Sequence, residues 1–199
     1  MNRLLHNQFV HARRVRNLAG YLSPFIPDRA SLLDIGCGDG QLARCIASRR
    51  SDIAVQGVDV ALRRVSNIPT QIYDGRKIPY PDRSFDIVML IDVLHHATDS
   101  VHLLREASRV SRTGVLIKDH VAESEWDQWT LRGMDYIANA RHGLHLPSRY
   151  WSWSEWNAAF DELGLRRMET IELVKLYPGV ANFVFGRKLH FICLLRGAR

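Results

Sequence analysis

The segment Leu32-Leu-Asp-Ile-Gly-Cys-Gly-Asp-Gly40 joins a short apolar run to three glycines that are spaced two residues apart. Glycines let the backbone turn sharply and approach a ligand closely at the carboxyl end of a strand, where parallel sheets bind their ligands. The spacing differs from the GxGxxG fingerprint of dinucleotide sites, because Gln41 stands where the last glycine is required. The sequence also lacks a P-loop Gly-Lys-Ser/Thr. We therefore expect a ligand-binding loop in which Gly36 and Gly38 lie at the ligand. The spacing weakens the interpretation as a dinucleotide site, and the sequence gives no support for triphosphate hydrolysis.

Two acidic residues end the next apolar runs. Asp59 follows Ile53–Val58, and Asp74-Gly75 follows Thr70–Tyr73. Carboxylates accept hydrogen bonds from the hydroxyl and amino groups of a ligand. Both acids could instead be ordinary turn residues, but their position at the ends of successive strands beside the glycine loop favours ligand binding.

Polar residues also follow the fourth and fifth predicted strands, over 85–91 and 114–118. Asp119 and His120 come directly after the fifth strand, so His120 is a candidate general base with Asp119 or another carboxylate orienting it. The alternative is that both residues cap the following helix. After the fourth strand, Asp92 is a polar candidate for ligand contact. His95 and His96 follow it. One of the two is a candidate contact to cofactor or substrate, and we take His96 as the catalytic candidate, while helix capping or packing is the alternative for the other.

The cysteines and the remaining histidines predict no metal site. His142 and His145 have a spacing compatible with two metal ligands, but no thiol or nearby acidic residue completes a set. The three cysteines are widely spaced and odd in number, so they form neither a disulfide framework nor a CxxC pair. We expect a reducing, cytoplasmic location. No apolar run reaches the length that crosses a bilayer.

Alternation of apolar strands with helices predicts an α/β fold, in which a mainly parallel sheet is covered by helices on both faces. We expect one Rossmann-like domain over residues 1–199 with seven strands and a C-terminal antiparallel hairpin. The other expected elements are an N-terminal helix over 2–22 within segment 1–28, a short helix after Asp59, helices over 100–110, 121–140 and 152–163, and hairpin strands over 165–174 and 189–196.

Segment 119–156 is inserted after the fifth strand and contains all five tryptophans. Helices in this position lie above the ligand end of such a sheet, so we interpret the segment as a lid that shapes an apolar or aromatic pocket, with Trp126 and Trp129 contacting substrate. A helical layer that only packs on the sheet is the equal alternative.

The segment Asp34-x-Gly36-x-Gly38-x-Gly40 resembles motif I of class I S-adenosylmethionine-dependent methyltransferases, and the resemblance continues in order through most of the chain. It implies that Asp59 binds the ribose hydroxyls of S-adenosylmethionine and that Asp74-Gly75 contacts the adenine. Asp34 is expected to orient the loop or to receive the cofactor's ammonium through water. The stretch 78–96, which ends in His95-His96, resembles the group of methyltransferases that includes ubiquinone and menaquinone biosynthesis enzymes. The expected cofactor-binding residues are Asp34, Gly36, Gly38, Asp59, Asp74, Gly75 and Asp92.

The charge balance invites a second interpretation. Lys and Arg number 27 against 21 Asp and Glu, which gives a formal net charge of +6 and could indicate nucleic acid. However, Asp92 follows the fourth strand without the Asn/Asp-Pro-Pro-Tyr arrangement of enzymes that methylate base amines, and no RNA-binding module is recognisable. We therefore expect methyl transfer by in-line displacement to oxygen or carbon of an aromatic or lipid-like small molecule. The alternatives are an RNA methyltransferase and a non-catalytic cofactor-binding protein.

Overall fold

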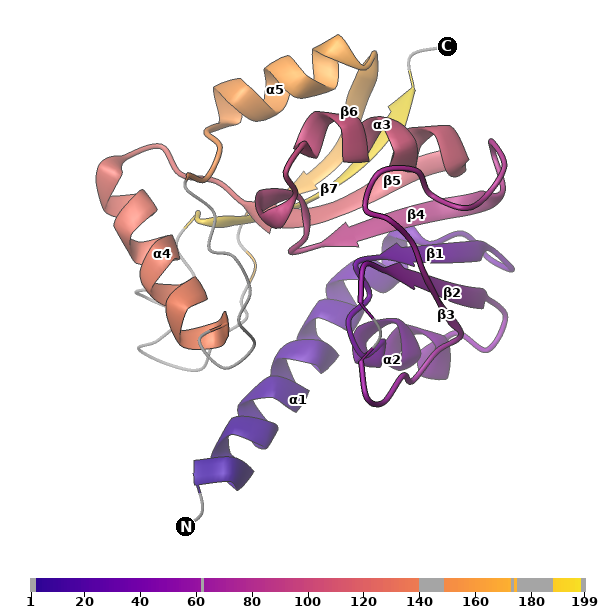
Figure 1. Ribbon diagram of the computed structural model, residues 1–199, viewed down its shortest axis with the longest axis horizontal. Helices are drawn as coiled ribbons and strands as arrows, with labels where there is room; N and C mark the ends of the chain where they lie inside the picture. The colour runs from indigo at the N-terminus through magenta and orange to yellow at the C-terminus, as the bar shows by residue number, and fades with distance from the viewer. Residues whose placement is uncertain (1–2, 62, 140–148, 173, 175–187, 198–199) are drawn as a thin grey trace.

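The computed structural model describes residues 3–61, 63–139, 149–172, 174 and 188–197 (Figure 1). Seven strands form one sheet in the order β3-β2-β1-β4-β5-β7-β6. Strands β3, β2, β1, β4 and β5 run parallel to one another, and β7 runs antiparallel to both β5 and β6. The strands are β1 Ser31–Ile35, β2 Ala54–Asp59, β3 Thr70–Ile72, β4 Phe85–Ile91, β5 Ser111–His120, β6 Leu165–Ile171 and β7 His190–Gly197.

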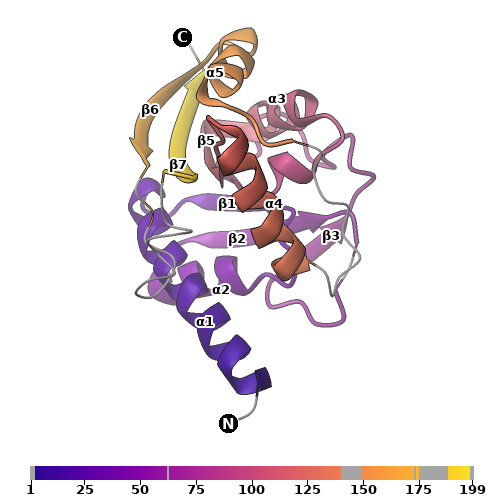
Figure 2. The same cartoon turned by 90° about the vertical axis from the view of Figure 1, so that its left-hand side faces the viewer.

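Helices cover both faces of this sheet because the central strands carry apolar side chains on both faces. Leu33 and Val88 pack in the core that includes α3 and α5, whereas their neighbours Leu32 and Ile87 pack in the core that includes α1 and α2. α4 stands beyond the carboxyl ends of β4 and β5, and Figure 2 shows it lengthwise in front of the sheet. The helices are α1 Arg3–Leu22, α2 Gln41–Arg49, α3 Ser100–Val110, α4 Glu125–Asn139 and α5 Trp153–Glu162, with 3₁₀ turns η1 Ser23–Phe25 and η2 Leu94–His96.

Local sequence signals account for several element boundaries. Ser152 and Glu155 form the predicted capping box of α5, in which each side chain accepts from the other residue's backbone N–H. Gly164 follows α5 with φ +63°, a conformation that glycine adopts without steric cost. The predicted C-terminal hairpin is confirmed, with β6 ending at Ile171.

The end of β5 differs from the prediction. Asp119 and His120 do not follow the fifth strand but are its last two residues, because β7 pairs with them and places His120 opposite His190. α4 begins only at Glu125, so neither residue caps it and that alternative is wrong. The strand therefore carries these two polar side chains directly into the interior.

The short helix expected after Asp59 is also wrong. Residues 60, 61 and 63–69 contain no helix. Side-chain hydrogen bonds organise this connection instead: the Ser66 hydroxyl donates to the Ile68 carbonyl, and the Asn67 amide donates to the Asp39 carbonyl.

We predict opposite stability effects for two glycine-to-alanine substitutions. A Cβ at Gly114 of β5 would lie 2.7 Å from the Leu195 carbonyl oxygen of β7, whereas a Cβ at Gly133 of α4 has nothing within 4 Å. Gly114→Ala should destabilise the domain by about 1–3 kcal/mol through overpacking. Gly133→Ala should stabilise it by up to about 1 kcal/mol through helix propensity. Urea unfolding followed by circular dichroism measures both, and a Gly114→Ala variant as stable as the parent would contradict the close β5–β7 approach.

Candidate active site

The three loop glycines have different surroundings although each has a positive φ. A Cβ at Gly36 would lie 2.6 Å from Val93 Cγ2, and one at Gly40 would lie 2.6 Å from Ile68 Cγ1. A Cβ at Gly38 would meet nothing within 4 Å. The outer glycines therefore permit close packing, and the middle one leaves open space above the loop.

The Asp59 carboxylate ties this loop to the end of β2. One oxygen accepts from the Gly38 N–H at 2.8 Å, and the other accepts from the Ala61 N–H at 3.1 Å. Asp34 lies nearby in β1 and is buried. Its pKa is raised well above the ordinary range by burial and, to a smaller degree, by the negative charge of Asp59.

A cavity of about 820 Å³ opens beside these residues. Four of the predicted cofactor residues line it: Gly36, Asp59, Asp74 and Gly75. One oxygen of Asp74 accepts from the backbone N–H groups of Arg76 and Lys77, at 2.8 and 3.0 Å. The remaining oxygen of this exposed carboxylate is available to a ligand.

Asp92 does not line that cavity. It has φ +57° and its carboxylate contacts Lys118 of β5 and, at 2.7 Å, Arg14 of α1. Burial raises the pKa of Asp92, but these two cations more than offset it and hold the pKa well below the ordinary value. Cations from two elements therefore hold the Asp92 side chain, and, like Asp34 and Gly38, Asp92 is not among the residues that line the cavity.

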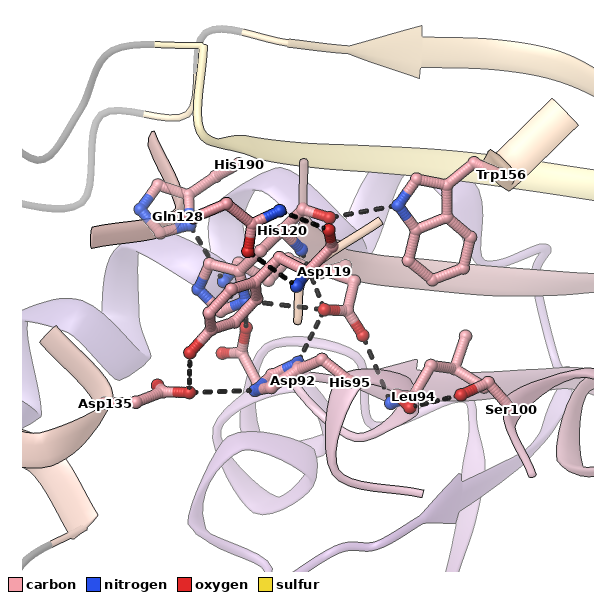
Figure 3. Close-up of polar contacts among 12 residues, drawn as sticks. Asp92, Leu94, His95, Ser100, Asp119, His120, Gln128, Asp135, Trp156 and His190 are labelled. Carbon is pink, nitrogen blue, oxygen red and sulfur yellow. Dashed lines mark hydrogen bonds and ion pairs between the residues drawn. The ribbon is translucent and has the colours of Figure 1, made fainter. Parts of the chain in front are cut away.

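A buried histidine–aspartate pair occupies the carboxyl ends of β4 and β5 (Figure 3). His95 Nδ1 lies 2.6 Å from Asp119 Oδ1, and their side chains are 4% and 0% exposed. The other Asp119 oxygen accepts from the Leu94 N–H at 3.1 Å, so the carboxylate also fixes the 3₁₀ turn η2 that carries His95. An ionised Asp119 selects the tautomer with the proton on Nδ1 and leaves Nε2 as a proton acceptor.

A second cavity of about 750 Å³ adjoins the first. Its walls include His95, His120, Trp151 and Trp156, and it shares residues 96–99 with the cavity beside the glycine loop. The Trp151 and Trp156 rings meet edge to face with centroids 4.8 Å apart. The arrangement places a ligand cavity, a buried base and a second aromatic-walled cavity side by side.

Residues 5–170 match the family of proteins described as "Methyltransferase domain". This chain belongs to that family. The predicted resemblance to class I S-adenosylmethionine-dependent methyltransferases and the mainly parallel seven-stranded fold are confirmed, and S-adenosylmethionine is the cofactor of these enzymes.

Individual relatives match parts of the methyltransferase domain. The 27-O-demethylrifamycin SV methyltransferase of Amycolatopsis mediterranei (strain S699) is 36% identical over 115 residues, which are 51% of this chain and 41% of that protein. A demethylmenaquinone methyltransferase of Tropheryma whipplei (strain Twist) is 31% identical over 93 residues, 42% of this chain and 38% of that protein. The chain thus spans about two fifths of these relatives.

A solved structure shows the same fold over almost the whole chain. The complex between the Haloferax volcanii Trm112 methyltransferase activator and a methyltransferase matches with a TM-score of 0.70 and 15% identity, covering 98% of this chain and 94% of that one. No helix in the described ranges of the methyltransferase domain is long and apolar enough to cross a membrane.

The predicted catalytic histidines take different positions in the domain. His96 lines both cavities, and its ring centroid lies 4.0 Å from that of His95. His120 lies 3.4 Å from Asp119 Oδ1 through Nδ1, but burial and the neighbouring Lys118 lower its pKa to about 4. His120 is therefore a weaker base than His95, the member of the His95-His96 pair that was not chosen as the catalytic candidate from sequence.

Electrostatics distinguish His95 from its neighbours. Burial lowers the pKa of His95, but the carboxylates of Asp119, Asp92 and Asp135 outweigh burial and raise the pKa above its ordinary value. The pKa of Asp119 is correspondingly low, because the charges and hydrogen bonds of His95 and His120 outweigh its burial. His95 and Asp119 therefore form an oriented, hydrogen-bonded pair at the boundary of the second cavity.

The expected substrate contacts of Trp126 and Trp129 stay a prediction. Their residues are 68% and 65% exposed, and neither lines a described cavity. The face of α4 that turns inward carries Gln128, Leu131 and Asp135, all of which are buried. The aromatic walls of the site come instead from the segment before α5 and from α5 itself.

Two groups of three side chains within the described residues bring possible metal-ligand atoms within 4.8 Å of one another. They are His95 with Asp119 and His120, and His95 with His96 and Asp135. His142 and His145, on which the metal argument from sequence turned, lie outside the described residues. The absence of a metal site stays a prediction.

We predict that His95 titrates above pH 6.5 in the folded domain and that Asp119→Asn moves this titration to lower pH. The shift follows because the variant removes the carboxylate that most favours the imidazolium. Histidine-ring resonances followed by NMR against pH measure it. Asp82→Asn, at the opposite end of β4, should leave the His95 titration unchanged, and equal effects of both variants would contradict the pairing.

Proposed function

We propose that this domain transfers the methyl group of S-adenosylmethionine to a hydroxyl group of a small molecule, with His95 as general base and Asp119 orienting it. The observation that carries the proposal is the buried 2.6 Å contact between His95 Nδ1 and Asp119. The name of the relative from Amycolatopsis, a 27-O-demethylrifamycin SV methyltransferase, is consistent with an oxygen acceptor.

The residues around the first cavity fit the cofactor. Each Asp59 oxygen that accepts a backbone N–H keeps capacity for a ribose hydroxyl, and Asp74 has a free oxygen for an amino group. The open space over Gly38 lets the ligand approach the backbone. Asp34 is a buried carboxyl beside the negative charge of Asp59, and an ammonium group nearby would compensate its charge. When bound, the cofactor supplies an electrophilic methyl group on a positively charged sulfur.

The protein's own part is positioning and proton removal. Methyl displacement needs the acceptor oxygen in line with the methyl group in a dry site. A hydroxyl is a poor nucleophile until its proton is removed, and a positioned base contributes about 10²–10⁴-fold. His95 Nε2 is buried and has no hydrogen-bond partner among the described residues. We infer that the acceptor hydroxyl donates to this atom.

The second cavity supports a small acceptor with a flat or apolar ring. Its Trp151 and Trp156 rings offer stacking and apolar contact. His96 lies where both cavities meet and is proposed to contact cofactor and acceptor. In this proposal Asp119 positions His95. His120 has a structural role, and its carbonyl oxygen accepts from the Trp156 indole N–H at 3.0 Å.

We predict that Asp59→Asn lowers cofactor affinity by about 10–100-fold, because hydrogen bonds to a charged acceptor contribute about 1.5–3 kcal/mol. Isothermal titration calorimetry with S-adenosylmethionine measures the affinity. Glu162→Gln on the exposed part of α5 is the matched control and should bind normally. Unchanged affinity in Asp59→Asn would remove Asp59 from the cofactor site.

We predict that His95→Gln and Asp119→Asn reduce methyl transfer by about 10²–10⁴-fold while cofactor affinity stays within twofold. The assay incubates the protein with methyl-labelled cofactor and a cell extract separated into RNA, protein and small molecules. Label should enter the small-molecule fraction. Label confined to RNA would favour the nucleic-acid alternative, and cofactor binding without label in any fraction would favour a non-catalytic binder.

A further inference from the structure

A second carboxylate faces His95 from the side opposite Asp119. Asp135 of α4 places one carboxylate oxygen 3.6 Å from His95 Nε2, and Asp135 is only 8% exposed (Figure 3). The separation exceeds a hydrogen bond. In the part of the chain that the structure describes, His95 Nε2 therefore has an acidic neighbour but no hydrogen-bond partner.

Asp135 is held in place by contacts that do not involve His95. The Tyr150 hydroxyl donates to the same carboxylate oxygen. Gln128, two turns earlier on α4, fixes Tyr150 by accepting from its N–H at 2.9 Å and donating to its carbonyl at 2.8 Å. The carboxylate is thus a built feature of the site rather than a chance approach of a surface side chain.

The two facing atoms, His95 Nε2 and the Asp135 oxygen, both require a hydrogen-bond donor from the methyl-accepting substrate. Neutral His95 Nε2 and ionised Asp135 both accept hydrogen bonds, and neither can donate to the other. A hydroxyl has one proton, so an acceptor hydroxyl that donates to Nε2 leaves the Asp135 oxygen facing its lone pairs. That oxygen already accepts from the Tyr150 hydroxyl, but its remaining lone pair and negative charge would face the lone pairs of the acceptor hydroxyl, which is unfavourable in a buried site. A second donor beside the reacting hydroxyl satisfies both atoms.

We propose that the acceptor is a vicinal diol, in which one hydroxyl is methylated against His95 and the other donates to Asp135. This inference rests on the proposed function and makes Asp135 a substrate-specificity residue. In the reaction, the methyl carbon–sulfur bond breaks and its electron pair stays on sulfur, while a carbon–oxygen bond forms to the first hydroxyl. The proton of that hydroxyl passes to His95 Nε2. The second hydroxyl keeps its proton and Asp135 stays ionised.

The first experiment sorts acceptors by this chemistry without knowing their identity. The small-molecule fraction of an extract is passed over immobilised phenylboronate at alkaline pH, which retains vicinal diols. The retained and unretained pools are then incubated with the full chain and methyl-labelled cofactor. We expect at least tenfold more label in compounds from the retained pool.

Each outcome decides a separate question. Label mainly in the unretained pool, which contains amines and isolated hydroxyls, overturns the diol inference and leaves the proposed function standing. No label from either pool, with intact cofactor binding, overturns the proposed function. Activity that a chelator abolishes and Mg²⁺ restores also overturns the inference, because a metal ion would then bridge the acceptor and Asp135.

The second experiment tests Asp135 with the purified diol and its analogue that lacks the neighbouring hydroxyl. Asp135→Ala should lower the preference for the diol, measured as the ratio of kcat/KM values, at least tenfold. Asp135→Asn keeps a carbonyl oxygen as acceptor and should recover part of the preference. Glu125→Gln, which changes an exposed acid on the same helix, should preserve it. Equal losses for both substrates in Asp135→Ala, with no recovery in Asp135→Asn, would show a merely structural role and overturn the inference.

Discussion

The carboxylate of Asp119 connects the two elements on which the site depends. It is fully buried at the end of β5 and accepts from His95, from the Leu94 N–H and from its neighbour's N–H. A buried charge is tolerated only when hydrogen bonds and opposite charge satisfy it, so the position of η2 after β4 and the position of β5 are fixed by the same group. β7 completes this constraint, because its antiparallel pairing keeps residues 119 and 120 in the sheet rather than in a loop.

A second cluster of ion pairs, around Asp92, accounts for part of the excess of basic residues in the chain. Arg14 of α1 and Lys118 of β5 both contact Asp92, and Lys118 also lies 3.3 Å from His190 Nδ1. Burial lowers the pKa of Lys118 in spite of the attraction of Asp92. This part of the positive charge neutralises an internal carboxylate and attaches the N-terminal helix to the carboxyl end of the sheet, so it says little about a polyanionic partner.

The elements that could be predicted from the sequence are those that depend on local residue patterns. Apolar runs gave the strands, the spacing of the glycines located the loop, and Ser152 with Glu155 marked the start of α5. Sequence reasoning was less successful where tertiary contacts choose between neighbours. His95 and His96 are adjacent in sequence, and only the turn of η2 directs His95 to Asp119. Asp135 is one of several acids on a helix whose exposed tryptophans dominate its sequence pattern, so its place beside His95 had no local signal.

The contact between Gly36 and Val93 has a consequence for how the two halves of the site are spaced. Val93 immediately precedes η2, and its side chain occupies the room that a larger residue at position 36 would need. The backbone of the glycine loop therefore rests directly on the segment that leads to His95. This van der Waals contact, together with the pairing of β1 with β4, fixes the separation between the cofactor side and the base through contacts within the protein itself.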